Sequence, residues 1–174
     1  TGDAMFNEVF LDEVFVPDDC VVGEVNDGWK LARTTLANER VAMGSSKLGV
    51  STERAVGLLA DRTSDTDAAL VGHQVALATL CQLLGVRSTL RSIAGRGPGP
   101  ESSVAKLLGV RNRQEAAELV VDMHGPAALF TTDDPQIAKD VHEMLLNRCL
   151  SIAGGTTQIL RNVVAERVLG LPRS

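Results

Sequence analysis

The sequence predicts an all-α protein, an antiparallel helical bundle with a short β remnant at its N-terminus. Of its 174 residues, 44% are hydrophobic but only 3% are aromatic, and tyrosine is absent. A core of alanine, leucine, valine and glycine is typical of closely packed helices. Apolar residues recur at helical spacings along most of the chain.

The first 25 residues differ from the rest. Apolar residues at 9–11 and 14–16 flank Asp12 and Glu13, and Pro17 then ends the pattern. This predicts short β structure closed by a turn. We therefore divide the chain into a β end and linker over residues 1–25 and a helical bundle domain over residues 26–174.

Five helical segments follow, separated by glycine, proline and capping residues. The short connections between them favour an antiparallel bundle. The segments are expected at about 29–62, 67–93, 102–124 (with Ser102 or Ser103 as N-cap), 135–151 and from Thr156 or Thr157 onward. On the first segment, one apolar stripe is expected to face the core, formed by Trp29, Ala32, Leu36, Met43 and Val50.

Composition and charge argue against several classes of function. The net charge of −5 disfavours nucleic-acid binding, which normally requires a basic face. No apolar run comes near the roughly 20 residues that span a bilayer, so we expect no membrane contact.

The three cysteines form no CxxC pair and no secretory leader is visible, so reduced thiols of a cytoplasmic protein are expected. The three histidines lack partners at metal-ligand spacing, so we expect no metal site. Because the chain begins at Thr1 without Met, we expect a fragment or a processed product.

Two strings imitate functional motifs. Residues 95–100 are rich in glycine, but their prolines remove N–H donors that a phosphate cradle needs. Ser103-Val104-Ala105-Lys106 matches the SxxK string of serine acyl-enzymes, yet neither Ser-Asp-Asn nor Lys-Thr-Gly follows. We interpret the first string as a plain loop and the second as a helix cap followed by a solvated lysine.

Glu39 is a candidate catalytic residue. It falls on the apolar stripe of the first helix, where an ionised carboxylate is costly to bury unless it is paired or used. Desolvation there would make it a stronger general base. The alternative is a structural ion pair with Arg40 or Arg33, and position alone favours this alternative.

Gly154-Gly155-Thr156 is a second candidate. Two glycines allow the backbone to approach a ligand, and the start of the following helix offers free N–H groups. A hydroxyl at the cap can also bond a cofactor. The alternative is an ordinary turn between two helices, which these three residues alone favour.

Several stretches, in the right order, resemble the acyl-CoA dehydrogenase family. Residues 152–162, Ile-Ala-Gly-Gly-Thr-Thr-Gln-Ile-Leu-Arg-Asn, and residues 165–173, Ala-Glu-Arg-Val-Leu-Gly-Leu-Pro-Arg, are similar to its terminal signature. Residues 10–17 resemble the end of its middle β domain, and residues 22–29 resemble the linker into its C-terminal helical domain. The resemblance covers the whole chain, which lacks the family's N-terminal helical domain and most of its β domain.

The resemblance implies FAD-dependent α,β-dehydrogenation of an acyl-CoA thioester, with electrons passed to an electron-transfer flavoprotein. Many members carry the catalytic carboxylate at the position of Gly154, which cannot act as a base. A minority carry it on the first helix of the C-terminal domain, just before an arginine. Glu39-Arg40 matches that arrangement, so the resemblance favours Glu39 as the base that removes the α-proton.

The same match assigns the binding residues of the site. Arg40 and Gly155 would bind the acyl-CoA substrate. Thr156 and Gln158 would bind FAD.

Two strings that serve the FAD of a neighbouring subunit depart from the family pattern. Arg62 keeps the arginine of Arg-x-x-Phe-Gly, but the phenylalanine and glycine are missing. Gly125 keeps part of Gln-x-x-Gly-Gly, but Asp122 replaces the glutamine and would bring negative charge toward a pyrophosphate. Arg62 and Gly125 are the remaining candidates for FAD binding. We expect a homo- or hetero-oligomer, a dimer or tetramer, in which a homologous subunit supplies the intact strings.

Two alternatives stay open within the resemblance. An acyl-CoA oxidase of the same fold would use the same residues and pass electrons to oxygen. A non-catalytic helical subunit of a heteromeric dehydrogenase would serve assembly only. The chain alone is expected to bind FAD weakly or not at all, and to be inactive.

Overall fold

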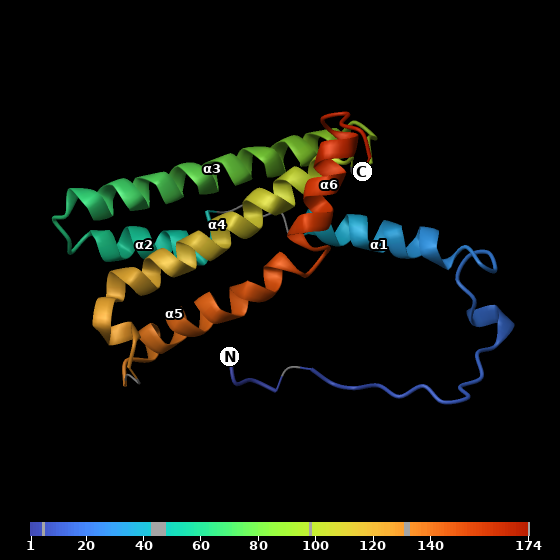
Figure 1. Ribbon diagram of the computed structural model, residues 1–174, viewed down its shortest axis with the longest axis horizontal. Coiled ribbons are helices and arrows are strands. Elements are labelled where there is room, and N and C mark those ends of the chain that lie inside the picture. The colour runs from blue at the N-terminus through green and yellow to red at the C-terminus, as the bar shows by residue number, and fades with distance from the viewer. Residues whose placement is uncertain (5, 43–47, 98, 131–132, 174) are drawn as a thin grey trace.

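The computed structural model describes residues 1–4, 6–42, 48–97, 99–130 and 133–173, and of residues 37–42 it describes the backbone only. Within these ranges the regular structure is helical, so the predicted all-α bundle is confirmed (Figure 1). The α-helices are α1 (Gly28–Ala42), α2 (Val50–Leu59), α3 (Asp65–Ile93), α4 (Glu101–His124), α5 (Pro135–Leu146) and α6 (Thr157–Arg167). Short 3₁₀ helices are η1 (Asp18–Cys20), η2 (Gly125–Ala128) and η3 (Asn147–Ser151).

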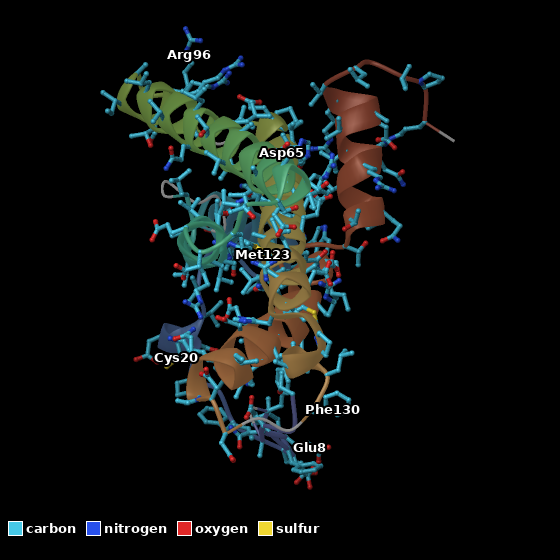
Figure 2. All side chains as sticks on the ribbon, turned by 90° about the vertical axis from the view of Figure 1, so that its left-hand side faces the viewer. Glu8, Cys20, Asp65, Arg96, Met123 and Phe130 are labelled. Carbon is cyan, nitrogen blue, oxygen red and sulfur yellow. The ribbon has the colours of Figure 1, made fainter. Side chains whose placement is uncertain are left out.

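α4 is the central helix of the bundle. α3 runs antiparallel to it, α2 and α5 pack along it, and α6 crosses its N-terminal half (Figure 1). Val120 and Met123 of α4 meet Ala55 of α2 and Val71 of α3 in a buried apolar cluster. Figure 2 looks along the bundle and shows Met123 among these helices.

Small residues on α4 allow its neighbours to approach closely. Gly109, Ala116 and Ala117 are all buried, and the two alanines are only 1% and 2% exposed. A helix that buries small side chains brings more backbone and side-chain atoms into contact per turn. The small residues that dominate the composition therefore lie between packed helices, as the sequence predicted.

The predicted N-terminal β structure is wrong. Apart from η1, the described residues before α1 form an extended segment without a strand. Phe6, Phe10 and Phe15 are between 85% and 93% exposed, so this segment does not enter the core. A strand needs a partner strand for its hydrogen bonds, and the described part of the chain offers none to this segment.

The predicted single helix over 29–62 is also wrong. Leu48 and Gly49 lie outside any helix between α1 and α2, and Gly49 has a φ of 98°, which favours glycine. The expected apolar stripe is consequently interrupted. Trp29 and Val50 are 74% and 76% exposed, and Met43 lies outside the described residues.

The later helices begin within two residues of their predicted positions, because capping residues fix them. The helix predicted at 135–151 is divided, since α5 ends at Leu146 and the 3₁₀ helix η3 continues to Ser151. The hydroxyl of Ser64 accepts a hydrogen bond from the amide of Asp67 at the start of α3. The carboxylate of Asp134 does the same for the first amides of α5. The predicted cap of α4 is wrong, since Pro100 occupies the N-cap position and Ser103 is a fully buried residue inside the helix.

α3 meets the length and composition of a membrane span, contrary to the expectation from the sequence. Its most apolar 18 residues have a mean hydropathy of 1.5, and 28% of that window is buried in the bundle. Core helices of soluble proteins pass the same test, so this property alone is weak evidence. α3 also carries a buried polar link to α4.

That link joins Gln74 of α3 to Asn112 of α4. Both side chains are 3% exposed. The amide nitrogen of Gln74 donates to the side-chain and backbone oxygens of Asn112, over 2.7 and 2.8 Å. A buried side-chain amide that is hydrogen-bonded to another helix fixes how the two helices are rotated about their axes and shifted along them relative to each other.

Replacement of Gln74 by Met should therefore lower the free energy of unfolding by about 1–3 kcal/mol, because the buried oxygen of Asn112 loses its donor while the volume is nearly kept. Urea unfolding followed by circular dichroism measures this. Gln82→Met, at a half-buried position on the same helix, is the control and should cost much less. Equal losses for the two variants would contradict the role of the link.

Candidate active site

The signature residues form a turn between η3 and α6, here called the signature turn (residues 150–157). Gly154 has a φ of 65° and Gly155 a φ of 105°, so both lie in the left-handed region that favours glycine. Gly154 is buried and Gly155 half-buried. The two glycines are thus required by the backbone, which turns sharply from η3 into α6.

The end of the turn is an open helix start. Of the two predicted caps, Thr156 is the N-cap of α6, and its hydroxyl accepts a hydrogen bond of 3.3 Å from the amide of Ile159. Leu160 is fully buried and anchors the helix, whereas Gln158 is exposed. The first amides of any α-helix have no carbonyl partner within the helix and carry the positive end of its dipole. This start therefore offers backbone donors, a threonine hydroxyl and a glutamine amide to a polar ligand such as FAD.

Lys106 of α4 holds the signature turn from behind. The residue is 1% exposed, and its ammonium donates to the carbonyl oxygens of Leu150 and Gly155, each over 2.9 Å. The prediction of a solvated lysine is therefore wrong. Ser103, one turn earlier, is also fully buried. The sequence did contain a signal for the burial of Lys106. Helical spacings of three and four place Ser103, Lys106 and Val110 on one face of α4, and all three are buried.

Glu39 and Arg40 belong to the last turns of α1, and their side chains lie outside what the structure describes. α1 packs against α4, as α6 does. Trp29 and Ala32 on the first turns of α1 are exposed, so the beginning of the predicted stripe is not covered within this chain. The catalytic assignment of Glu39 and the substrate assignment of Arg40 remain predictions.

Arg62 and Gly125 lie at the other end of the bundle. A guanidinium nitrogen of Arg62 pairs with the carboxylate of Asp67 over 2.7 Å, and another donates to the carbonyl oxygen of Met123. Gly125, with a φ of 60°, ends α4. Within the described residues, the arginine predicted to reach a neighbouring FAD thus already has two partners in its own chain.

A buried polar cluster that the sequence did not predict adjoins Gly125. The carboxylate of Asp140 on α5 lies 2.8 Å from Nε2 of His124 and 3.1 Å from Nε of Arg54, and accepts a bond of 2.9 Å from Gln136. The side chains of His124 and Asp140 are only 8% and 10% exposed. The four residues come from α2, α4 and α5. Gln136 and Asp140 stand at the helical spacing i,i+4, which was the available signal, but Arg54 and His124 lie 86 and 16 residues from Asp140 and follow no motif.

Burial alone would raise the pKa of the Asp140 carboxyl. Hydrogen bonds from His124, Arg54 and Gln136, together with the charge of Arg54, outweigh burial and hold that pKa below its ordinary value of 3.8. The cluster ties three helices together through one ionised carboxylate. Its role is to hold the end of α4, on which Gly125 sits.

The two groups of predicted site residues are far apart. Lys106, at the signature turn, and Met123, at Arg62, are 17 residues apart on α4. At about 1.5 Å of rise per residue, this corresponds to roughly 25 Å. Thr156, Gln158 and Gly155 therefore belong to one site and Arg62 and Gly125 to another.

The two sites differ in how well they fit FAD. The signature turn presents donors at the start of α6, and its residues fit a flavin or thioester. The Arg62 end does not fit a pyrophosphate, because its arginine is engaged and the carboxylate of Asp122 is exposed in the last turn of α4. In the described ranges no group of three His, Cys, Asp or Glu side chains lies close enough together to hold a metal ion.

Comparison with known proteins agrees with the resemblance of the sequence. Residues 26–169 match the family model described as the acyl-CoA dehydrogenase C-terminal domain. The chain is 49% identical over 175 residues to acyl-CoA dehydrogenase FadE34 of Mycobacterium tuberculosis, covering 99% of this chain and 24% of that protein. It is 36% identical over 179 residues to acyl-CoA dehydrogenase IpdE1 of Mycolicibacterium smegmatis, covering 99% and 44%. The chain thus spans less than half the length of these relatives.

Solved structures share the fold. A variant of the Tcur3481-Tcur3483 steroid ACAD superposes with a TM-score of 0.73 at 25% identity, covering 91% of this chain and 44% of that one. A subunit of the ChsE4-ChsE5 complex from Mycobacterium tuberculosis superposes with a TM-score of 0.70 at 26% identity, with the same coverage. The chain belongs to the acyl-CoA dehydrogenase family and has the fold of its C-terminal domain.

The Asp140 cluster makes stability depend on pH. Because the folded-state pKa lies below the unfolded value of 3.8, the contribution of Asp140 is present above that value and is lost as the pH falls through the folded-state pKa. We expect Asp140→Asn to lower the free energy of unfolding at neutral pH by about 1–3 kcal/mol, with a difference that shrinks below about pH 4. Urea unfolding from acidic to neutral pH measures it. Asp61→Asn, at an exposed position, is the control, and a difference that stays constant with pH would contradict the assignment.

Proposed function

We propose that this chain is the C-terminal part of an acyl-CoA dehydrogenase, which oxidises an acyl-CoA thioester between its α and β carbons. The observation that carries the proposal is the signature turn, whose two left-handed glycines and capping threonine open the start of α6 to a ligand. Bound FAD would supply the hydride acceptor, and an electron-transfer flavoprotein would take the electrons. An acyl-CoA oxidase would differ only in that last step.

Glu39 is the proposed base that removes the α-proton. Gly154, at the position where many family members carry a carboxylate, has no side chain to do so. Arg40, next to Glu39, would bind the acyl-CoA and favour the ionised form of the carboxylate. α1 and the signature turn both pack on α4, which supports a common site for Glu39 and Gly155.

The remaining contacts to ligands come from the signature turn. The half-buried Gly155 would lie against the thioester, where any side chain would block close approach. Thr156 and the exposed Gln158 would face the flavin. The other walls of the site would come from domains that the relatives have in addition to this one, which supports the expectation that the chain alone is inactive.

The acyl group is proposed to be bulky. A structural neighbour at 25% identity is a steroid ACAD, which supports a steroid-derived acyl thioester as the first substrate to test. A straight-chain acyl-CoA of similar mass is the matched alternative.

Glu39→Gln in the complete enzyme should lower kcat by about 10²–10⁴, because an amide cannot accept the α-proton. Reduction of bound FAD by the acyl-CoA, followed by stopped-flow absorbance, measures this step. Glu115→Gln, which removes a half-exposed carboxylate of α4 that pairs with Arg111, should leave the rate unchanged. If Glu39→Gln leaves the rate of FAD reduction unchanged, Glu39 is not the catalytic base, and a subunit that serves assembly only is favoured.

The complete enzyme is proposed to be heteromeric. Arg62 is engaged within its own chain, and Asp122 is exposed at the same end, so this end is poorly suited to the FAD of a partner. The fold is shared with complexes of two named components, ChsE4-ChsE5 and Tcur3481-Tcur3483. A homologous second subunit would supply the intact FAD-binding strings.

An exposed apolar stripe on α3 supports association. The α3 stripe consists of Leu83, Val86, Leu90 and Ile93, which are between 53% and 78% exposed. Their spacings of three and four place them on one side of the helix, in the pattern that a second helix covers.

The groove along the α3 stripe is lined by Arg87, Arg91 and Arg96. Arg91 pairs with Glu101 of its own chain over 2.7 Å, and Figure 2 shows Arg96 at the rim of the bundle, pointing away from it. Two identical stripes would bring the guanidinium groups of Arg87 and Arg96 together. A homologous subunit with carboxylates at the facing positions would pair with them instead, and this is the proposed occupant of the groove.

Leu83→Asp combined with Leu90→Asp should separate the complete enzyme into its subunits, because an apolar interface cannot bury two unpaired carboxylates. Sedimentation velocity measures the change of mass. Leu70→Asp, at a half-exposed position on another side of α3, is the control and should leave the mass unchanged.

The wild-type complete enzyme should hold fewer FAD molecules than subunits, since one kind of subunit contributes little to its partner's FAD. Native mass and flavin absorbance together give this ratio. A homodimer with one FAD per subunit would contradict the heteromeric proposal.

A further inference from the structure

We propose that Lys106 is a positioning residue, whose buried ammonium sets the direction in which the signature turn presents its backbone donors. The functional part of this inference rests on the proposed acyl-CoA dehydrogenase activity. Its structural part rests on the contacts of Lys106 alone.

The first observation is the burial of Lys106 in the middle of α4. A lysine that is 1% exposed is rare, because an ammonium leaves water only at a high cost unless hydrogen-bond acceptors replace the water. Two such acceptors are the carbonyl oxygens of Leu150 and Gly155, each 2.9 Å from Nζ. Hydrogen bonds from an ionised donor are about twice as strong as those between neutral groups.

The second observation is the place of these two acceptors in the chain. Leu150 lies in η3, before the double glycine, and Gly155 is its second member. One ammonium therefore bridges the beginning and the end of the turn. Glycine residues with positive φ have many accessible conformations, and the bridge selects one of them.

The third step follows from the geometry of the peptide bond. A trans peptide is planar, and its C=O and N–H point in opposite directions. The carbonyl of Gly155 points at Lys106 on α4. The amide N–H of Thr156, in the same peptide, must then point away from α4, toward the outer side of the turn.

That amide is one of the first donors of α6, and Thr156 itself is only half-buried. A cation on the carbonyl of the same peptide also polarises its N–H and makes it a stronger donor. In the proposed reaction this donor faces the thioester or the flavin, which Gly155 and Thr156 are expected to contact. Lys106 acts through this peptide and touches neither ligand.

Amide hydrogen exchange tests the structural part on this chain as it stands. In Lys106→Met, peptides covering residues 150–158 should exchange at least tenfold faster than in the wild type, while α3 stays protected. Lys139→Met removes an exposed lysine of α5 and should change nothing. Val110→Ala, one turn further along α4, is a control for a general loss of core packing.

Two results would overturn the structural part. One is unchanged exchange at 150–158 in Lys106→Met. The other is an equal increase in Val110→Ala, which would assign the effect to lower overall stability. If Lys106→Met does not fold, Lys106→Gln keeps a neutral donor and should give a smaller increase at the same peptides. Unchanged exchange in that variant would also overturn the inference.

The functional part is tested in the complete enzyme. Lys106→Met should lower kcat at least tenfold with KM changed less than about twofold, and Lys106→Arg, which keeps the charge, should restore part of the rate. Faster amide exchange at residues 150–158 together with an unchanged kcat would overturn the positioning role of Lys106. If the unaltered complete enzyme does not oxidise any acyl-CoA, the proposed function fails, and the exchange data still decide whether Lys106 holds the turn.

Discussion

The structure depends on the burial of α4, since α1, α2, α3, α5 and α6 all pack against it. A helix enclosed in this way is normally apolar on every side, yet α4 buries Ser103, Lys106 and Asn112 within nine residues of each other. Two of them are bonded across to neighbouring elements, Lys106 to the signature turn and Asn112 to α3. Apolar packing would allow α4 to rotate or slide, and these directional bonds fix its orientation toward each partner.

The two ends of α4 use this principle for different purposes. At its N-terminal half, one cation organises a backbone turn built from two glycines with positive φ, and the result is an open helix start. At its C-terminal end, one anion, Asp140, gathers a histidine, an arginine and a glutamine from three helices, and the result is a closed cluster. The first end thus leaves Thr156 half-buried and Gln158 exposed, whereas the partners at the second end are already satisfied by one another.

Much of the fold could be predicted from local signals. The boundaries of α3, α5 and α6 follow from Ser64, Asp134 and Thr156, whose side chains cap the next amides, so the information lies within three residues of each boundary. The break before α2 lies at Gly49, whose φ of 98° one glycine in the sequence does not reveal. The conformation of the first 25 residues depends on partner strands elsewhere, which local patterns do not contain.

The candidate site was predictable to the same extent. The turn at Gly154-Gly155 could be read from its glycines, because its conformation is encoded where it occurs. The spacing of Ser103, Lys106 and Val110 indicates that Lys106 is buried, but its partner could not be predicted, and neither could those of Arg62, because the carbonyls that they bond lie 49 and 61 residues further along the chain. A side chain's role is readable only when its partner is close in sequence or follows a repeated spacing.

The length of α4 has an evolutionary consequence. The residues at its two ends are separated by a rigid helix, so substitutions at one end leave the geometry of the other intact. After gene duplication, one copy can lose the residues that serve its partner's cofactor and keep its own ligand site, while the second copy takes the reverse course. A few point substitutions can in this way make two paralogues depend on each other without any change of fold. At each step the two copies together can still form an active enzyme.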